Sequence, residues 1–185
     1  MIADVNARQT LLHTLPKNAV AAEIGVWRGD FSQNILRVTE PKTLYLIDPW
    51  QTNKDETYAK SWYGSAAHTD METIYQSVRN RFRQQIESGV VCVVRGPSAA
   101  GLSGLPDGHL DFAYVDGDHT FEGVQSDLDL CYAKVKTNGF ICGDDYLLGK
   151  WWKDGVVRAV NEFIGRRRVR IVMVLDAQFL LQKLG

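Results

Sequence analysis

The 185-residue sequence has no long apolar run and almost no net charge. No stretch approaches the ~20 consecutive apolar residues that a membrane-spanning helix needs. The formal net charge of −1 creates no overall field that would attract nucleic acid or an anionic membrane. The first ten residues include Asp4 and lack a basic segment followed by an apolar one, so no signal peptide is expected. These absences favour a cytoplasmic protein whose partner is neither nucleic acid nor a membrane.

Cysteine is also scarce, because the chain has only Cys92, Cys131 and Cys142. Their wide spacing and apolar surroundings fit neither a disulfide framework nor a zinc site, and they indicate buried thiols in a reducing compartment. Repeats, low-complexity tracts and Pro- or Ser-rich linkers are missing as well. A chain of this length fits one domain with a sizeable core, so we expect a single domain over residues 1–185.

What the sequence does contain is an alternation of short β-branched runs with longer segments of helical period. Consecutive apolar positions favour parallel strands that are covered on both faces. The expected parallel strands are 19–25, 43–48, 90–95, 110–116 and 139–144, and the expected helices are 31–38, 71–86, 120–135 and 155–167. Residues 168–175 and 178–183 are too close for a parallel crossover and should form an antiparallel hairpin. The pattern predicts a doubly wound, mostly parallel α/β sheet of seven strands.

Acidic residues stand at the carboxyl end of nearly every expected strand. Ligands of doubly wound sheets bind at this edge. Six carboxylates on one rim would repel one another without cations or hydrogen-bond donors. The acidic residues concerned are Glu23, Asp48, Asp116, Asp118, Asp144 and Asp145.

The turn after the first strand has glycine at both ends, Gly25 and Gly29, but none between them. A dinucleotide site needs a middle glycine so that the backbone can approach the pyrophosphate, so a diphosphate is disfavoured. The turn suits a ligand with a carboxylate and an ammonium, such as the methionine end of S-adenosylmethionine. Asp48 follows Gly25 by 23 residues, near the ~20-residue offset at which an acid meets ribose hydroxyls. The same glycines would also serve simply to shape a strand-to-helix turn.

Four segments carry a family resemblance: AEIGVWRGDFS, LYLIDPW, YVDGDHTFEGVQSDLDL and NGFICGDDY. They resemble the class I methyltransferases, and they are similar to the branch that includes macrocin O-methyltransferase and related natural-product sugar O-methyltransferases. The resemblance runs from about residue 21 to residue 163, and DGDHTFEGV is its most specific part. It implies a Rossmann-like fold that ends in the hairpin and a cofactor, S-adenosylmethionine. The implied cofactor-binding residues are Glu23, Gly25 and Gly29 at the methionine end, Asp48 on the ribose, Ser98 near the adenine, and Asp116.

The helical N-terminal extension of that branch is nearly missing here, because the first expected strand begins at about residue 19. Substrate contacts and a homodimer that depend on this extension are left open.

Asp116 and the pair Asp144 and Asp145 end neighbouring strands, so their carboxylates are expected to meet. All-oxygen ligands favour a hard divalent cation, Mg²⁺ first, with Mn²⁺ or Ca²⁺ as others, and no Cys or His spacing indicates zinc. In the resembling sugar methyltransferases the matching aspartates hold Mg²⁺. Alternatively, Asp116 contacts only the cofactor and the Asp144–Asp145 pair caps the next segment.

Asp118 and His119 are the candidate catalytic residues, because a hydroxyl acceptor needs a base beside the metal. An acid at the position of Asp118 is the base in the resembling sugar methyltransferases, and the position of His119 matches the base of related catechol methyltransferases. Both residues would also suit the cap of a helix that begins at Thr120.

We therefore expect an S-adenosylmethionine-dependent, Mg²⁺-assisted O-methyltransferase that acts on a hydroxyl group of a small molecule. Residues 49–69 lack periodicity and include several aromatic residues, so they are expected to form a lid or acceptor-binding loop. Trp151 and Trp152 are expected to line the acceptor pocket or a subunit contact. Two other functions stay open: a nucleoside-binding module without activity, and an NAD-dependent oxidoreductase, which the missing middle glycine disfavours.

Overall fold

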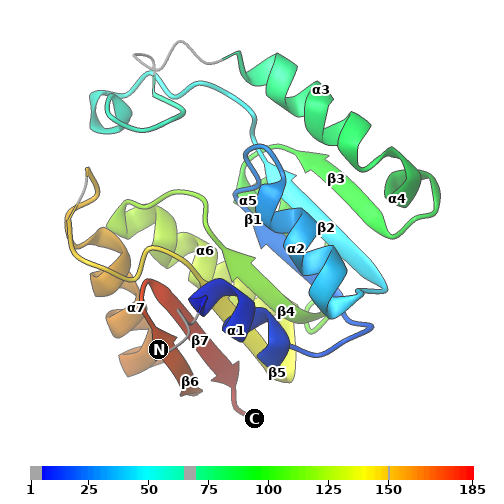
Figure 1. Ribbon diagram of the computed structural model, residues 1–185. Helices are drawn as coiled ribbons and strands as arrows, with labels where there is room; N and C mark the ends of the chain where they lie inside the picture. Colours follow the sequence, from blue (N-terminus) through cyan, green and yellow to red (C-terminus); the bar gives the residue numbers. More distant parts are fainter. Residues whose placement is uncertain (1–5, 65–69, 150) are drawn as a thin grey trace, which may run out of the picture.

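A seven-stranded sheet runs through the centre of the computed structural model, which describes residues 6–64, 70–149 and 151–185 (Figure 1). The strand order is β3-β2-β1-β4-β5-β7-β6. Strands β1 to β5 pair in parallel, and β6 and β7 form the antiparallel hairpin, so the expected fold class is confirmed. The strands are β1 (Val20–Ile24), β2 (Thr43–Asp48), β3 (Val91–Arg95), β4 (Leu110–Val115), β5 (Val135–Gly143), β6 (Val169–Leu175) and β7 (Gln178–Lys183).

Helices cover both faces of this sheet (Figure 1). Buried residues of α1, α2 and α3 pack with one set of strand side chains, and those of α5, α6 and α7 pack with the other set. The α-helices are α1 (Ala7–Thr14), α2 (Asp30–Thr39), α3 (Met71–Arg81), α4 (Arg83–Glu87), α5 (Ser98–Ser103), α6 (Phe121–Lys134) and α7 (Gly155–Arg166). Because alternate strand residues face opposite layers, Ala21 lies in the first core and Ala22 in the second. None of the helices in the described ranges is long and apolar enough to cross a membrane.

The helices differ from the expectation in three places, and one of them is α5 (Ser98–Ser103), which was not predicted. Helix α1 was not predicted, although Asn6 caps it by accepting a hydrogen bond from the backbone N–H of Gln9. The single helix expected over 71–86 is divided into α3 and α4 at Phe82, whose backbone leaves the helical region at φ −102° and ψ 19°. The Phe82 ring is buried against Gly29, so a tertiary contact accompanies the break.

Strand β5 begins at Val135, directly after α6 and earlier than the expected residue 139. Asn138 has a left-handed backbone, and the pairing of β5 with β4 shifts in register beside it. The described part of the loop after β2 includes the 3₁₀ turn η1 (Glu56–Tyr58) and a bridge between Asn53 and Gly64. Residues 65–69 of the expected loop lie outside the described residues.

Candidate active site

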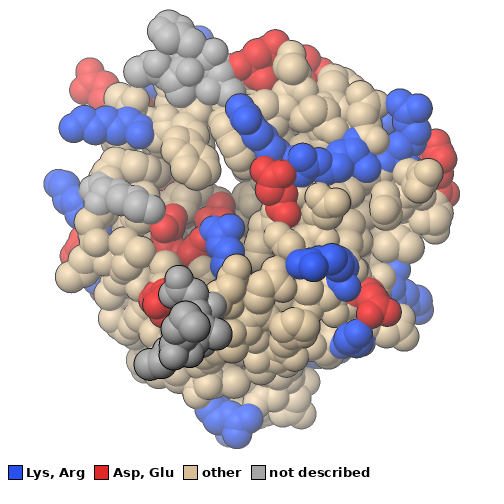
Figure 2. Space-filling view, viewed as in Figure 1, with Lys and Arg blue, Asp and Glu red and all other residues tan. Residues whose placement is uncertain are grey.

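A cleft of about 1200 Å³ opens at the carboxyl ends of the parallel strands. Acidic side chains gather in the hollow at the centre of this face, with a basic side chain beside them (Figure 2). The expected convergence of acids is therefore present, and Gly25 and Ser98 lie on the same lining. The acidic residues that line the cleft include all six expected ones: Glu23, Asp48, Asp116, Asp118, Asp144 and Asp145.

The first turn of the cleft depends on Gly25. Its backbone has φ +84°, a conformation that side chains disfavour, and a Cβ there would lie 2.1 Å from the carbonyl oxygen of Asp116. The backbone N–H of Asp116 in turn donates to the carbonyl of Ile24. The turn after β1 and the turn after β4 are therefore in direct backbone contact. Gly29 also has a positive φ, but it caps α2 and packs against Phe82.

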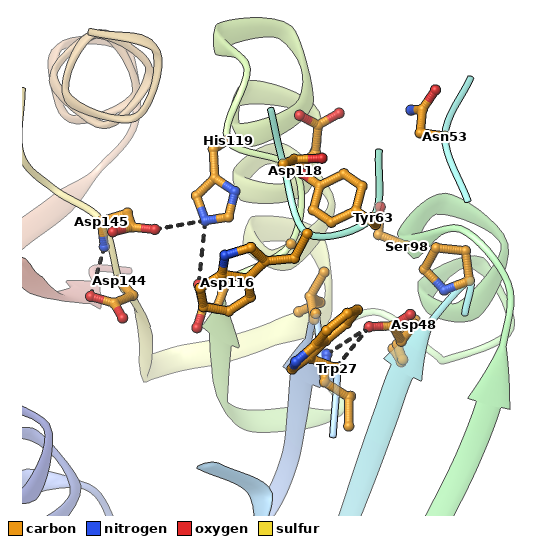
Figure 3. A pocket seen from close by; sticks show the side chains of 18 of the residues that line it. Trp27, Asp48, Asn53, Tyr63, Ser98, Asp116, Asp118, His119, Asp144 and Asp145 are labelled. Atoms are coloured by element: carbon orange, nitrogen blue, oxygen red, sulfur yellow. Dashed lines mark hydrogen bonds and ion pairs between the residues drawn. The ribbon is translucent and has the colours of Figure 1, made fainter. Parts of the chain in front are cut away.

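Asp48 fixes the same turn from the end of β2. One carboxylate oxygen accepts hydrogen bonds from the backbone N–H groups of Val26 (2.9 Å) and Trp27 (3.0 Å), and the other accepts from Trp50 (2.6 Å) (Figure 3). Burial raises the pKa of Asp48, and these three backbone donors oppose that shift. The carboxylate thus holds the loop in shape, a role that its spacing in the sequence did not indicate. Its expected contact with a ribose stays a prediction.

Glu23 forms part of the buried wall of the cleft. Its side chain is 1% exposed and accepts a hydrogen bond from the Ser32 hydroxyl of α2. Burial raises the pKa of Glu23 well above its usual range, the Ser32 hydrogen bond opposes this, and the charges of Asp116 and Asp48 raise it further. A carboxyl group in such surroundings would gain from a cationic ligand, because a nearby positive charge favours its ionised form.

Asp116, His119 and Asp145 form the tightest group of potential metal ligands. Nε2 of His119 lies 2.9 Å from Oδ2 of Asp145 and 3.4 Å from Oδ1 of Asp116 (Figure 3). Asp145 reaches this position from a left-handed backbone with φ 56°, which is costly for a residue that is not glycine. Among the described residues, one ligand atom from each of these three lies within 4.8 Å of the others.

Asp144, the remaining expected metal ligand, points to a different set of partners. Its carboxylate accepts hydrogen bonds from the side chains of Gln178 and Arg8, and from the backbone N–H of Asp145 at 2.7 Å. The same Arg8 guanidinium lies 3.5 Å from Oδ2 of Asp116. Asp116 therefore lies between Arg8 on the Asp144 side and His119 on the Asp145 side.

His119 is held between charged and aromatic neighbours. Burial would lower its pKa, but the contacts with Asp116 and Asp145 outweigh burial and raise it to about 9. Its ring stacks on Trp152, with ring centroids 5.0 Å apart. The imidazole is thus fixed on one face by the indole and at one edge by the two carboxylates.

Asp118 uses both carboxylate oxygens. Oδ1 accepts from the backbone N–H of Thr120 (2.8 Å), and Oδ2 accepts from the hydroxyl of Tyr58 (2.6 Å). The N-cap of α6 is Thr120, whose side chain accepts from the N–H of Gly123, so neither Asp118 nor His119 is the cap.

Aromatic rings form a wall beside Asp118 and His119. The rings of Tyr58 and Tyr63 lie 5.4 Å and 6.2 Å from that of Trp151, which meets His119 edge-on at 5.8 Å. The loop after β2 and the segment after β5 therefore meet over the end of β4. Trp151 and Trp152 do line the cleft.

Three residues of the site were not predicted from the sequence: Arg8, Asp127 and Gln178. Asp127 on α6 accepts a hydrogen bond from the Ser98 hydroxyl, and burial raises its pKa to about 6. Asn6 followed by Gln9 is a helix-start signal that would have revealed α1 and with it Arg8. No local signal identifies Asp127 or Gln178, because each becomes significant only through partners that are distant in the sequence.

Comparison with known families gives a match to a family described as methyltransferase domain over residues 22–146. The chain belongs to this methyltransferase family. The match includes every expected site residue from Glu23 to Asp145. The resemblance inferred from the motifs is therefore confirmed at the level of the family.

One relative is the uncharacterized protein R132 of Acanthamoeba polyphaga mimivirus, which is 38% identical over 158 residues. The alignment covers 84% of this chain but only 64% of the length of that relative. About a third of the relative's length therefore lies outside the alignment.

Solved structures share the fold. The O-methyltransferase NovP superposes with a TM-score of 0.67 at 20% identity, covering 96% of this chain and 80% of NovP. The O-methyltransferase TomG from Streptomyces achromogenes, solved in complex with SAM, has a TM-score of 0.68 at 16% identity, covering 100% of this chain and 82% of TomG. At these identities the similarity confirms the Rossmann-like methyltransferase fold.

Proposed function

We propose that this methyltransferase transfers the methyl group of S-adenosylmethionine to a hydroxyl group of a small molecule, with help from a divalent cation. The observation that carries the proposal is the direct contact between the Gly25 turn and the backbone of Asp116. This contact places the turn that is expected to bind the cofactor next to a group of acidic residues and a candidate base. The methyl donor and the acceptor would therefore meet above the end of β4.

The cofactor side fits S-adenosylmethionine through its charges and its backbone shape. Glu23 supplies a buried carboxyl group for the ammonium, and Gly25 lets the turn after β1 pack directly against the backbone of Asp116. Asp48 holds the turn, and its Oδ1, which among the described residues accepts only from Trp50, could accept a second hydrogen bond from a ribose hydroxyl, whereas Oδ2 already accepts two. Ser98 would lie near the adenine, anchored by Asp127.

The acidic side fits a hard divalent cation through its donor chemistry. Asp116, Asp144 and Asp145 supply carboxylate oxygens, and the first two already attract the guanidinium of Arg8. His119 lies close enough to Asp116 and Asp145 to act as an additional ligand or to orient them. A bound cation would supply stabilisation of the negative charge that develops on the acceptor oxygen.

Asp118 is the base that the geometry favours. Its Oδ2 already accepts a hydrogen bond from a hydroxyl group, that of Tyr58, as a base must do from the acceptor. The N–H of Thr120 fixes the other oxygen, so the carboxylate has a defined direction. His119 is occupied with two carboxylates and a stacked indole, which suits a residue that positions the acidic group.

The test is transfer of a labelled methyl group from S-adenosylmethionine to a panel of sugars, catechols and other hydroxylated small molecules. Turnover with an acceptor hydroxyl that stops in EDTA and returns with Mg²⁺ supports the whole proposal. Asp145→Ala should abolish this metal-dependent turnover and leave cofactor affinity within a few-fold. Turnover that is unchanged in EDTA would reject the metal, and methylation of nitrogen or carbon instead of oxygen would reject the acceptor class.

A further inference from the structure

Arg8 lies on α1, outside the sheet, and places a permanent positive charge beside the acidic residues Asp116 and Asp144. It stands in the first turn of α1, and its guanidinium pairs with Asp144 and lies 3.5 Å from Asp116. It also lies over the ring of Phe31, 5.0 Å from the ring centre. Among the lysines and arginines of the described ranges, Arg8 is the residue that pairs with these two acids.

We propose that Arg8 is a displaceable counter-ion, which occupies the acidic group when the cation is absent and moves outward when the cation binds. The inference rests on the metal site of the proposed function. A guanidinium stays protonated at every relevant pH, so it cannot yield to a metal by losing a proton. A metal coordinated by Asp116 and Asp144 would use the oxygens that Arg8 now holds, and the two positive charges would repel each other.

The structure allows this movement without unfolding of α1. Leu11 and Leu12 are fully buried and hold the helix against α2 and β7. The Arg8 side chain is 44% exposed, so its outer part has room to turn toward solvent. Its removal would leave Asp144 with Gln178 and the N–H of Asp145 as partners. Arg8 would thus keep the acids ordered and neutralised before metal binding, and it would lower the affinity for the metal.

The test is a titration of the full chain with Mn²⁺, in which electron paramagnetic resonance measures the concentration of the free ion. Arg8→Gln should lower the Kd for Mn²⁺ by about tenfold or more, and Arg8→Lys should give an intermediate value. Arg28→Gln is the matched control, because Arg28 lines the same cleft but lies over the ring of Trp27. The control should stay within about threefold of the wild type. Thermal unfolding curves would verify that each variant is folded.

A second measurement uses the wild-type protein, in which Arg8 keeps its charge. In ¹⁵N spectra of the wild type, the Arg8 Nε–H signal, assigned by its disappearance in Arg8→Lys, should shift toward that of a solvent-exposed arginine when Mg²⁺ is added. An unshifted signal at saturating Mg²⁺, or an Arg8→Gln variant that binds Mn²⁺ no more tightly than the wild type, would overturn the displacement and leave the metal site standing. If neither protein binds Mn²⁺, both this inference and the metal part of the proposed function fail.

Discussion

The hydroxyl of Tyr58 donates a 2.6 Å hydrogen bond to Oδ2 of Asp118, 60 residues further along the chain. This bond joins the loop after β2 to the acid after β4. The Tyr58 hydroxyl is a weak acid here, since burial and the neighbouring Asp118 raise its pKa to about 12. It therefore acts as a neutral donor, and an acceptor hydroxyl that reaches Asp118 would take its place.

Tyr58→Phe should keep the ring contact with Trp151 and remove only this donor. We expect kcat/KM for the acceptor to change by less than about tenfold. Asp118→Asn should lower kcat by roughly 10²- to 10⁴-fold, because a general base contributes about that much. Steady-state kinetics with labelled S-adenosylmethionine measure both. Equal losses in the two variants, or an active Asp118→Asn, would contradict the role of Asp118 as the base.

Gly25→Ala tests the close approach of the two turns. A Cβ at Gly25 would collide with the backbone of Asp116, whereas one at Gly108, which also has a positive φ, would meet nothing within 4 Å. Gly108→Ala should cost only about 1–2 kcal/mol of stability, the usual penalty for a left-handed residue. Gly25→Ala should cost ~4 kcal/mol or more and weaken the binding of S-adenosylhomocysteine. Urea unfolding and calorimetry would reveal the difference, and similar costs at the two positions would refute the contact.

Asp127 should make stability depend on pH. Its pKa is raised from 3.8 to about 6 by burial, so the folded protein holds a proton between these values that the unfolded chain releases. The free energy of unfolding should therefore fall as pH rises from about 4 to 6, by on the order of 3 kcal/mol. Asp127→Asn should remove this fall while its amide oxygen still accepts from Ser98. Chemical unfolding at pH 4 and pH 7 measures it, and parallel curves for the two proteins would argue against the shifted pKa.

The fold could be predicted because its signals are local. Apolar runs such as Val20–Ile24 and Leu110–Val115 gave the strands, and the two-residue link at Asp176 and Ala177 gave the hairpin. Several of the features that were not predicted depend on contacts that are distant in the sequence, although the start signal of α1 is local. The break at Phe82, for example, accompanies packing against Gly29, which lies in another part of the chain.

The presence of the strand-end acids in one cleft was also predictable, because parallel strands place their carboxyl ends at one edge. Which side chains of the site contact one another was not predictable. The side chain of Asp144 lies with Arg8 and Gln178, and His119 takes the place next to Asp116 and Asp145. These choices depend on α1, which was not expected, and on the left-handed backbone of Asp145, which no local residue pattern demands.

A calorimetric titration with S-adenosylhomocysteine and with NAD, each with and without Mg²⁺, tests whether the cleft binds a methyl donor. We expect S-adenosylhomocysteine to bind in both conditions and NAD not to bind. In the predicted site the affinity for S-adenosylhomocysteine depends on the shape of the Gly25 turn. The variant Gly25→Ala, which disturbs this turn, therefore serves as the control. Tight binding of NAD, or no response to S-adenosylhomocysteine, would contradict the assignment of the cleft to a methyl donor.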